Sequence, residues 1–292
     1  MRRRLLLLVL TLVCVGFLQA GLPATLTKAG NPDLYKSLMP RAKQNLMNLP
    51  KLYRKPYQKL LKKHNDILMA FLIAYESNAN LAHAVASDIE SNYREIVRLL
   101  DHDGMQYSPE FFLSYVARQS VSDERIGAYR KAMLDDGLSE VLQNYPDPLE
   151  RFRATTLWCV EKLQFRQTSG RDQSPLDIMQ KSLIGRCEEM QILLVAATRT
   201  VGIPSRPAST PWWAHMDNNH AWAEVWLDGA WQYTGDMDSA YFPNQTWFSA
   251  MIDKTVLILA EGSLAAEADE VLISGQYDRS EERRVGKECR SR

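Results

Sequence analysis

The chain of 292 residues has few cysteines and histidines, the side chains that most often bind zinc, since it contains four and five of them. Two of the cysteines lie near the chain ends, which leaves Cys159 and Cys187 for the folded part. Near Cys187 lie the histidines His215 and His220. These four residues do not have the composition and spacing of a zinc site. We therefore expect no metal and no cofactor.

A hydrophobic run long enough to favour a membrane span is also missing. The apolar run from Leu5 to Leu18 is too short for a stable span, and it follows three arginines and precedes Gln19-Ala20. These three parts are typical of a secretory signal peptide over residues 1–20, with cleavage after Ala20 or Ala24. A lipoprotein anchor is not expected, because Val13 precedes Cys14 at a position where a small residue is usual. We expect an exported protein, in the periplasm, cell envelope or extracellular space, without a membrane span after cleavage.

Residues 279–292 read RSEERRVGKECRSR and resemble the translation of a common DNA-sequencing adapter. The alternative is a basic tail that binds an acidic partner. On the adapter interpretation the natural protein continues past Asp278, and Cys289 has no biological meaning. Removing three basic residues in 1–20, and six basic and three acidic ones in 279–292, from the 35 of each sign leaves 26 basic and 32 acidic residues. No basic patch remains that would indicate nucleic-acid binding.

Strand patterns are scarce between residues 25 and 146, so this part is expected to be a helical domain. Apolar spacing predicts one helix through 60–72 and another through 81–97. Ser108-Pro109 and Asp147-Pro148 resemble helix starts. A second domain is expected over 147–250, and strand-like residues at 255–259 and 271–273 predict the beginning of a truncated β-rich domain over 251–278.

Cys187 opens a predicted amphipathic helix. Apolar residues recur at three- and four-residue spacing from Met190 to Val201, and Gly202 and Pro204 stop the pattern. The helix is therefore expected from about 186 to 201. A helix start presents unpaired N–H groups and the positive end of the dipole, which favours a thiolate.

His220 begins an aromatic and β-branched stretch that ends at Asp228-Gly229, a dipeptide typical of hairpin turns. Residues 231–234 are expected to form the returning strand. An imidazole at a strand end can accept a thiol proton and return it to a leaving amine, while a nearby carboxylate fixes its tautomer. Cys187, His220 and an acid from the Asp236–Asp238 cluster thus form a candidate catalytic set.

These segments resemble the transglutaminase-like superfamily of papain-fold cysteine enzymes, in a bacterial exported member. The resemblance covers residues 148–248 and is carried by Gly185-Arg186-Cys187, Thr200-Val201-Gly202-Ile203-Pro204-Ser205-Arg206, Asn219-His220-Ala221-Trp222-Ala223-Glu224-Val225-Trp226 and Gly229-Ala230-Trp231. It implies an α+β fold with a nucleophile helix packed on an antiparallel sheet. It also implies that Cys187 is the nucleophile and His220 the base.

The acid departs from the family pattern, in which it lies four residues after the hairpin tryptophan, where Gly235 stands here. Asp236 is one residue later, and such a shift turns a side chain to the other face unless a bulge intervenes. Asp238 resembles the acidic position of a bacterial subgroup that reads Gly-x-x-Glu after the same tryptophan, and we favour it. If neither reaches His220, the site is a dyad or is degenerate.

The resemblance implies an exported cysteine-dependent acyltransferase or peptidase that acts on peptide or glutamine amides of a protein or peptide substrate. The alternative is an inactive module of the same fold that binds proteins or peptides. Trp212, Trp213 and Trp222 are expected in the core or the wall of the substrate cleft. Cys159 and Cys187 could instead form a disulfide, although Cys159 lies in the apolar pattern of a helix and is expected to be a buried thiol.

Overall fold

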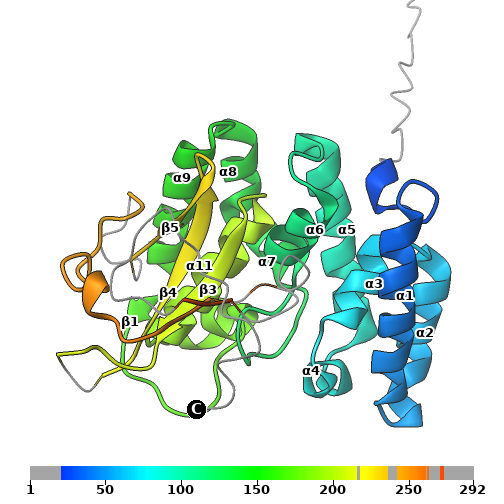
Figure 1. Cartoon of the computed structure of the whole chain (residues 1–292), viewed down its shortest axis with the longest axis horizontal. Coiled ribbons are helices and arrows are strands. Elements are labelled where there is room, and N and C mark those ends of the chain that lie inside the picture. Colours follow the sequence, from blue (N-terminus) through cyan, green and yellow to red (C-terminus); the bar gives the residue numbers. More distant parts are fainter. Residues whose placement is uncertain (1–20, 216–217, 236–241, 261, 263–269, 273–292) are drawn as a thin grey trace, which may run out of the picture.

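The computed structural model describes residues 21–215, 218–235, 242–260, 262 and 270–272. The predicted signal peptide and the tail over 279–292 lie outside them. After a short 3₁₀ turn, η1 (Ala24–Leu26), the N-terminal part consists of helices, as predicted: α1 (Pro32–Met47), α2 (Lys51–His64), α3 (Ile67–Ala74), α4 (Asn78–His83) and α5 (Ala86–Asp103). Figure 1 shows this bundle beside the part that contains the sheet. No helix in the described ranges has both the length and the apolar composition needed to cross a bilayer.

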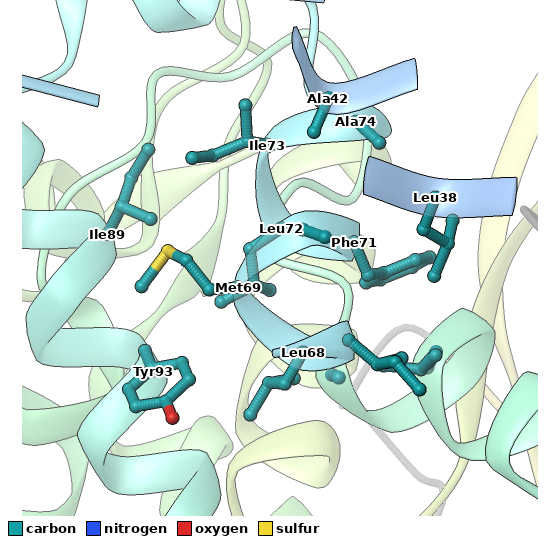
Figure 2. Close-up of a cluster of buried hydrophobic side chains, with 14 of the residues drawn as sticks. Leu38, Ala42, Leu68, Met69, Phe71, Leu72, Ile73, Ala74, Ile89 and Tyr93 are labelled. Carbon is teal, nitrogen blue, oxygen red and sulfur yellow. The ribbon is translucent and has the colours of Figure 1, made fainter. Parts of the chain in front are cut away.

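Helix α3 is the centre of the first hydrophobic core, and all eight of its residues are buried. Phe71 lies toward Leu38 of α1, and Met69 lies toward Ile89 and Tyr93 of α5 (Figure 2). An apolar helix without a polar face is stable only when neighbours cover it on all sides. The surrounding helices α1, α2 and α5 provide that cover.

Two helices predicted as continuous are each broken in the structure. The pattern through 60–72 is interrupted at Asn65, which has a positive φ of 51° and ends α2. Asp66 then begins α3 by accepting a hydrogen bond from the backbone N–H of Met69 at 2.8 Å. The pattern through 81–97 divides between α4 and α5. The apolar spacing continues across both breaks, so periodicity alone does not reveal them.

The next elements lead from the bundle to the sheet: α6 (Pro109–Phe112), the π-helical turn η2 (Leu113–Ala117), α7 (Tyr129–Met133), the π-helical turn η3 (Leu134–Leu138), α8 (Ser139–Asn144) and α9 (Pro148–Lys162). Both predicted starts are confirmed. Ser108 accepts from the Phe111 N–H at 3.3 Å, and Asp147 accepts from the Glu150 N–H at 2.9 Å. The buried residues of the first hydrophobic cluster end at Ala117, and those of the second begin at Val121. Several buried residues before the predicted boundary at 146 thus pack with the later part of the chain.

The second part combines a helix with an antiparallel sheet, so the predicted α+β class is confirmed. A parallel pair, β1 (Gln164–Phe165) and β2 (Ile184–Gly185), α10 (Pro175–Asp177) and the π-helical turn η4 (Ile178–Ser182) precede α11 (Cys187–Thr200). The five-stranded sheet has the order β5-β4-β3-β6-β7, with β3 (Ser205–Thr210), β4 (His220–Leu227), β5 (Ala230–Tyr233), β6 (Ile258–Ala260) and β7 (Glu270–Leu272). Helix α11 packs against β3 and β4. Its bounds confirm the helix predicted over 186–201.

The hairpin of β4 and β5 forms as predicted. Asp228 and Gly229 both have positive φ, 53° and 77°, as a tight turn matched to the strand twist requires. Opposite each other in β3 and β4, Arg206 and Glu224 form an ion pair, with Nε and Oε2 2.7 Å apart. The Arg206 guanidinium lies 4.1 Å from the ring centre of Trp231 in β5. These contacts connect the three strands.

The strands expected to open a separate β-rich domain belong to the same sheet instead. β6 pairs with β3 through Ala208 and Ala260, and β7 pairs with β6. Residues 258–260 and 270–272 therefore extend this sheet and do not begin a sheet of their own. A 3₁₀ turn, η5 (Ile252–Lys254), precedes β6, and the Lys254 carbonyl oxygen accepts from the Ala214 N–H at 2.7 Å.

Aromatic contacts join the helical part to the hairpin. The ring centre of Phe111 in α6 lies 5.2 Å from that of Trp226. The ring centre of Tyr115 in η2 lies 4.7 Å from that of Trp231. From α11, the buried Arg199 donates to the carbonyl oxygen of Ser120 at 2.9 Å. These contacts fix the loop after η2 beside the sheet.

Candidate active site

Cys187 is the first residue of α11 and is half-buried. A hydrogen bond closes the strand-to-helix corner around it, since the backbone N–H of Arg186 donates to Oε2 of Glu189 at 2.9 Å. Thr168 donates to the same oxygen at 3.0 Å. A Cβ on Gly185 would lie 2.4 Å from the Cβ of Glu189, so the corner requires glycine there. The Gly-Arg-Cys sequence thus places the sulfur at the helix N-terminus.

His220 is the first residue of β4 and pairs with Thr210 of β3. His220 is buried, with 4% of its surface exposed. Four aromatic rings surround the imidazole, with centroids between 4.9 and 6.2 Å away: Trp213, Trp222, Trp247 and Phe248. This packing holds the ring in one orientation.

Cys187 and His220 line one cleft of about 550 Å³. Met190 lines the same cleft, as do the exposed aromatic residues Phe165 and Trp247. The structure therefore brings together two residues that are 33 positions apart in the sequence. Their catalytic roles stay predictions.

Glu188 is a site residue that sequence reasoning missed. Its Oε2 accepts a hydrogen bond from the Cys187 thiol at 3.2 Å and from Nε of Arg186 at 2.9 Å. Its Oε1 accepts from Nδ2 of Asn219 at 3.4 Å. Burial acts to raise the pKa of Glu188, but the hydrogen bonds from Cys187 and its own backbone N–H, together with Arg186, lower it overall. Its place next to Cys187 in the chain was the available signal.

A second, smaller cleft of about 300 Å³ also has Glu188 in its lining. Glu188, Asn219 and His220 line both clefts. Val121 and Ser122, in the loop after η2, line the second cleft. The helical part therefore leads directly into one wall of the site region.

The three predicted cleft tryptophans divide into one exposed and two buried residues. Trp212 is 47% exposed, whereas Trp213 is 2% and Trp222 is 1% exposed. Both buried rings pack with Phe248 in a third hydrophobic cluster behind His220. Of the two expected places, core or cleft wall, Trp213 and Trp222 occupy the core, because neither ring has surface available to a substrate. They support the histidine instead.

The two candidate acids, Asp236 and Asp238, lie outside the described residues. The described strand leads up to them: the Thr234 N–H donates to the carbonyl oxygen of Ala223 at 2.9 Å, one position beyond the last paired residue of β5. Trp247, which contacts His220, had no signal in the sequence.

Cys159 lies in α9 and is completely buried, as predicted. Burial raises the pKa of its thiol. Cys159 and Cys187 are both thiols, so the disulfide alternative is not realised in the structure. Within the described ranges, no group of three histidine, cysteine or acidic side chains could hold a metal ion.

Comparison with known proteins points to one family. A family model described as "Transglutaminase-like superfamily" matches residues 137–235, a stretch that contains Cys187 and His220. No curated protein sequence matches the chain significantly. A solved structure from Cytophaga hutchinsonii, described as a "putative cysteine protease", aligns with 15% identity and a TM-score of 0.29. The alignment covers 50% of this chain and 55% of that one, and a likeness this weak carries no argument about activity.

The family match agrees with the arrangement of the site. The matched segment begins in η3, includes α11 with Cys187 at its first position, and continues through the hairpin that begins with His220. The Asp-Gly turn and the buried Arg206 and Glu224 pair lie within the same segment. Residues 137–235 are therefore similar to the transglutaminase-like superfamily over the segment that contains Cys187, His220 and the hairpin.

Proposed function

We propose that this protein is an exported thiol enzyme that performs acyl transfer or hydrolysis at peptide or glutamine amide bonds. The observation that carries the proposal is the shared cleft of Cys187 and His220, with the sulfur at the N-terminus of α11. The composition of residues 1–20 supports export. The substrate would be a protein or peptide that binds in this cleft, whose lining includes the exposed aromatic residues Phe165 and Trp247.

The proposed reaction begins when the Cys187 sulfur attacks the carbonyl carbon while its proton passes to His220. The Cys187 backbone N–H, at the helix start, would stabilise the oxyanion of the tetrahedral intermediate. His220 then gives the proton to the leaving amine, and a thioester remains on Cys187. Asp236 or Asp238 would orient the imidazole.

Water or an amine would then attack the thioester and release Cys187. Water gives a peptidase or amidase, and an amine gives a transglutaminase. Both polar and apolar residues line the cleft, and access of water to the thioester would decide between the two acceptors.

An inactive binding module is the second candidate function. The absence of an acid at the usual register, where Gly235 stands, is the observation in its favour. This candidate predicts that Cys187→Ala leaves the biological role intact. The enzyme predicts that the same substitution abolishes it.

Turnover distinguishes these candidates. The protein is incubated with unfolded casein, with and without a primary amine, and mass spectrometry detects new peptide termini, deamidated glutamines and amine adducts. We expect products that require both Cys187 and His220. If wild type, Cys187→Ala and His220→Ala give the same absence of products, and Cys187 also shows ordinary thiol reactivity, the enzyme proposal is wrong.

A further inference from the structure

We infer that Glu188 restrains the nucleophile: by accepting the Cys187 S–H it holds the thiol in its protonated form until the carboxylate turns away. This inference rests on the proposed function, because it concerns the regulation of the same site. Glu188 would be a positioning residue, since it acts on the reaction through Cys187.

The contact geometry provides the first argument. The Cys187 sulfur lies 3.2 Å from Oε2 of Glu188, within the range of a sulfur hydrogen bond. An ionised carboxylate only accepts hydrogen bonds, so the sulfur must be the donor and must carry its proton. The contact is therefore specific for the thiol and would be lost in the thiolate.

The charges around the contact provide the second argument. The lowered pKa of Glu188 keeps its carboxylate ionised near neutral pH, and an anion at this distance disfavours a second anion on the sulfur. Arg186 is the cation that faces Glu188, but its guanidinium also contacts Asp172 at 2.9 Å and Glu189 at 3.8 Å. One positive charge is thus shared among three carboxylates. The Arg186 guanidinium therefore neutralises the negative charge of Glu188 only in part.

The remaining contacts of Glu188 show how the restraint can be released. For attack, the proton must pass from the sulfur to the imidazole of His220, which leaves a thiolate and an imidazolium ion. When the S–H contact breaks, Arg186 and Asn219 still donate to the two oxygens of Glu188. The carboxylate can therefore leave the sulfur without becoming a buried, unsatisfied group. Asn219 directly precedes His220, so the same short segment contacts the carboxylate and carries the base.

The test is the rate of iodoacetamide labelling of Cys187 in the full chain, resolved by mass spectrometry of the Cys187 peptide, between pH 5 and 9. Glu188→Gln keeps the size of the side chain and removes its charge. We expect labelling at pH 7 to become about tenfold faster, as the loss of a neighbouring anion in a partly solvated site predicts. Glu188→Asp keeps the charge and withdraws it by one methylene, so an intermediate rate is expected.

Glu150→Gln is the matched control, because Glu150 also lies in the first turn of a helix and pairs with an arginine, Arg153, at 2.9 Å. It should leave labelling of Cys187 unchanged. Thermal unfolding checks that each variant is folded. If Glu188→Gln does not fold, the labelling rate of Glu188→Asp still tests the inference.

Each outcome has a separate meaning. An unchanged or slower rate in folded Glu188→Gln, or an equal increase in Glu150→Gln, would overturn the inference about Glu188. If His220→Ala still slows labelling in that case, the proposed function stands. If labelling is that of an ordinary thiol with and without His220, the proposed function itself fails.

Discussion

The buried ion pair of Arg206 and Glu224 should contribute strongly to the stability of the sheet that carries His220. The side chains of Arg206 and Glu224 are 1% and 0% exposed, and Nε of Arg206 lies 2.7 Å from Oε2 of Glu224. Glu224→Gln would leave the guanidinium charge buried beside a neutral amide. Removing one partner of a buried pair costs about 3–5 kcal/mol. We expect a loss near the lower end, about 3 kcal/mol, because the amide oxygen can still accept a hydrogen bond.

The assay is thermal and urea unfolding followed by tryptophan fluorescence, since Trp231 lies against Arg206 and reports on this region. For a chain of this size, about 3 kcal/mol corresponds to a fall in Tm of roughly 6–12 °C. The exposed pair of Glu150 and Arg153 is the control, and Glu150→Gln should change stability by less than about 1 kcal/mol.

Replacing both partners separates the cost of removing one charge from the value of the pair. Arg206→Leu with Glu224→Leu should be less destabilising than Glu224→Gln alone, because no buried charge remains. A Glu224→Gln variant within about 1 kcal/mol of wild type would refute the reasoning.

Three further predictions concern other parts of the chain. Burial raises the pKa of Glu76 from 4.5 to about 7, although hydrogen bonds from Asn80 and Ser77 act to lower it. Between pH 4.5 and about pH 7 the folded state therefore holds a proton that the unfolded state has released. Stability should therefore fall as pH rises through this window, by up to about 1.4 kcal/mol per pH unit, and urea unfolding of Glu76→Gln should lack this slope. Gly185→Ala should displace the Glu189 cap, destabilising the protein and slowing Cys187 labelling by iodoacetamide. Cys159 should resist labelling until urea unfolds the chain, and a thiol assay after unfolding should give equal counts with and without prior reductant.

Much of the fold that positions the site could be predicted because its signals are local. The nucleophile helix has apolar residues at helical spacing and ends at Gly202 and Pro204, and Asp228-Gly229 marks the hairpin. The breaks at Asn65 and between α4 and α5 were missed because the apolar spacing continues through them. The placement of β6 was missed because a three-residue strand has almost no periodicity, and its partner β3 is about fifty residues away in the chain.

The site was predictable where a motif spans adjacent residues, and less so where contacts are distant. Cys187 and His220 each lie in a recognisable sequence segment, and the structure places both at one cleft. Trp247 reaches His220 through a loop with no pattern of its own. Trp222 is of a residue type common in substrate clefts, but strand alternation alone does not tell which face of the sheet is covered. Phe248 covers the face on which Trp222 lies. Glu188 was overlooked because its role depends on a side-chain contact with its neighbour.

The central claim is that His220 activates Cys187, and the most direct test is the pH dependence of iodoacetamide labelling at Cys187 in wild type and His220→Ala. The account predicts labelling in wild type that is already substantial below pH 8.5, the region where an ordinary thiol ionises. It also predicts a rate at pH 7 that falls by about tenfold or more in His220→Ala, since the thiolate loses its proton acceptor. Slow labelling with the same ordinary thiol profile in both proteins would contradict the account.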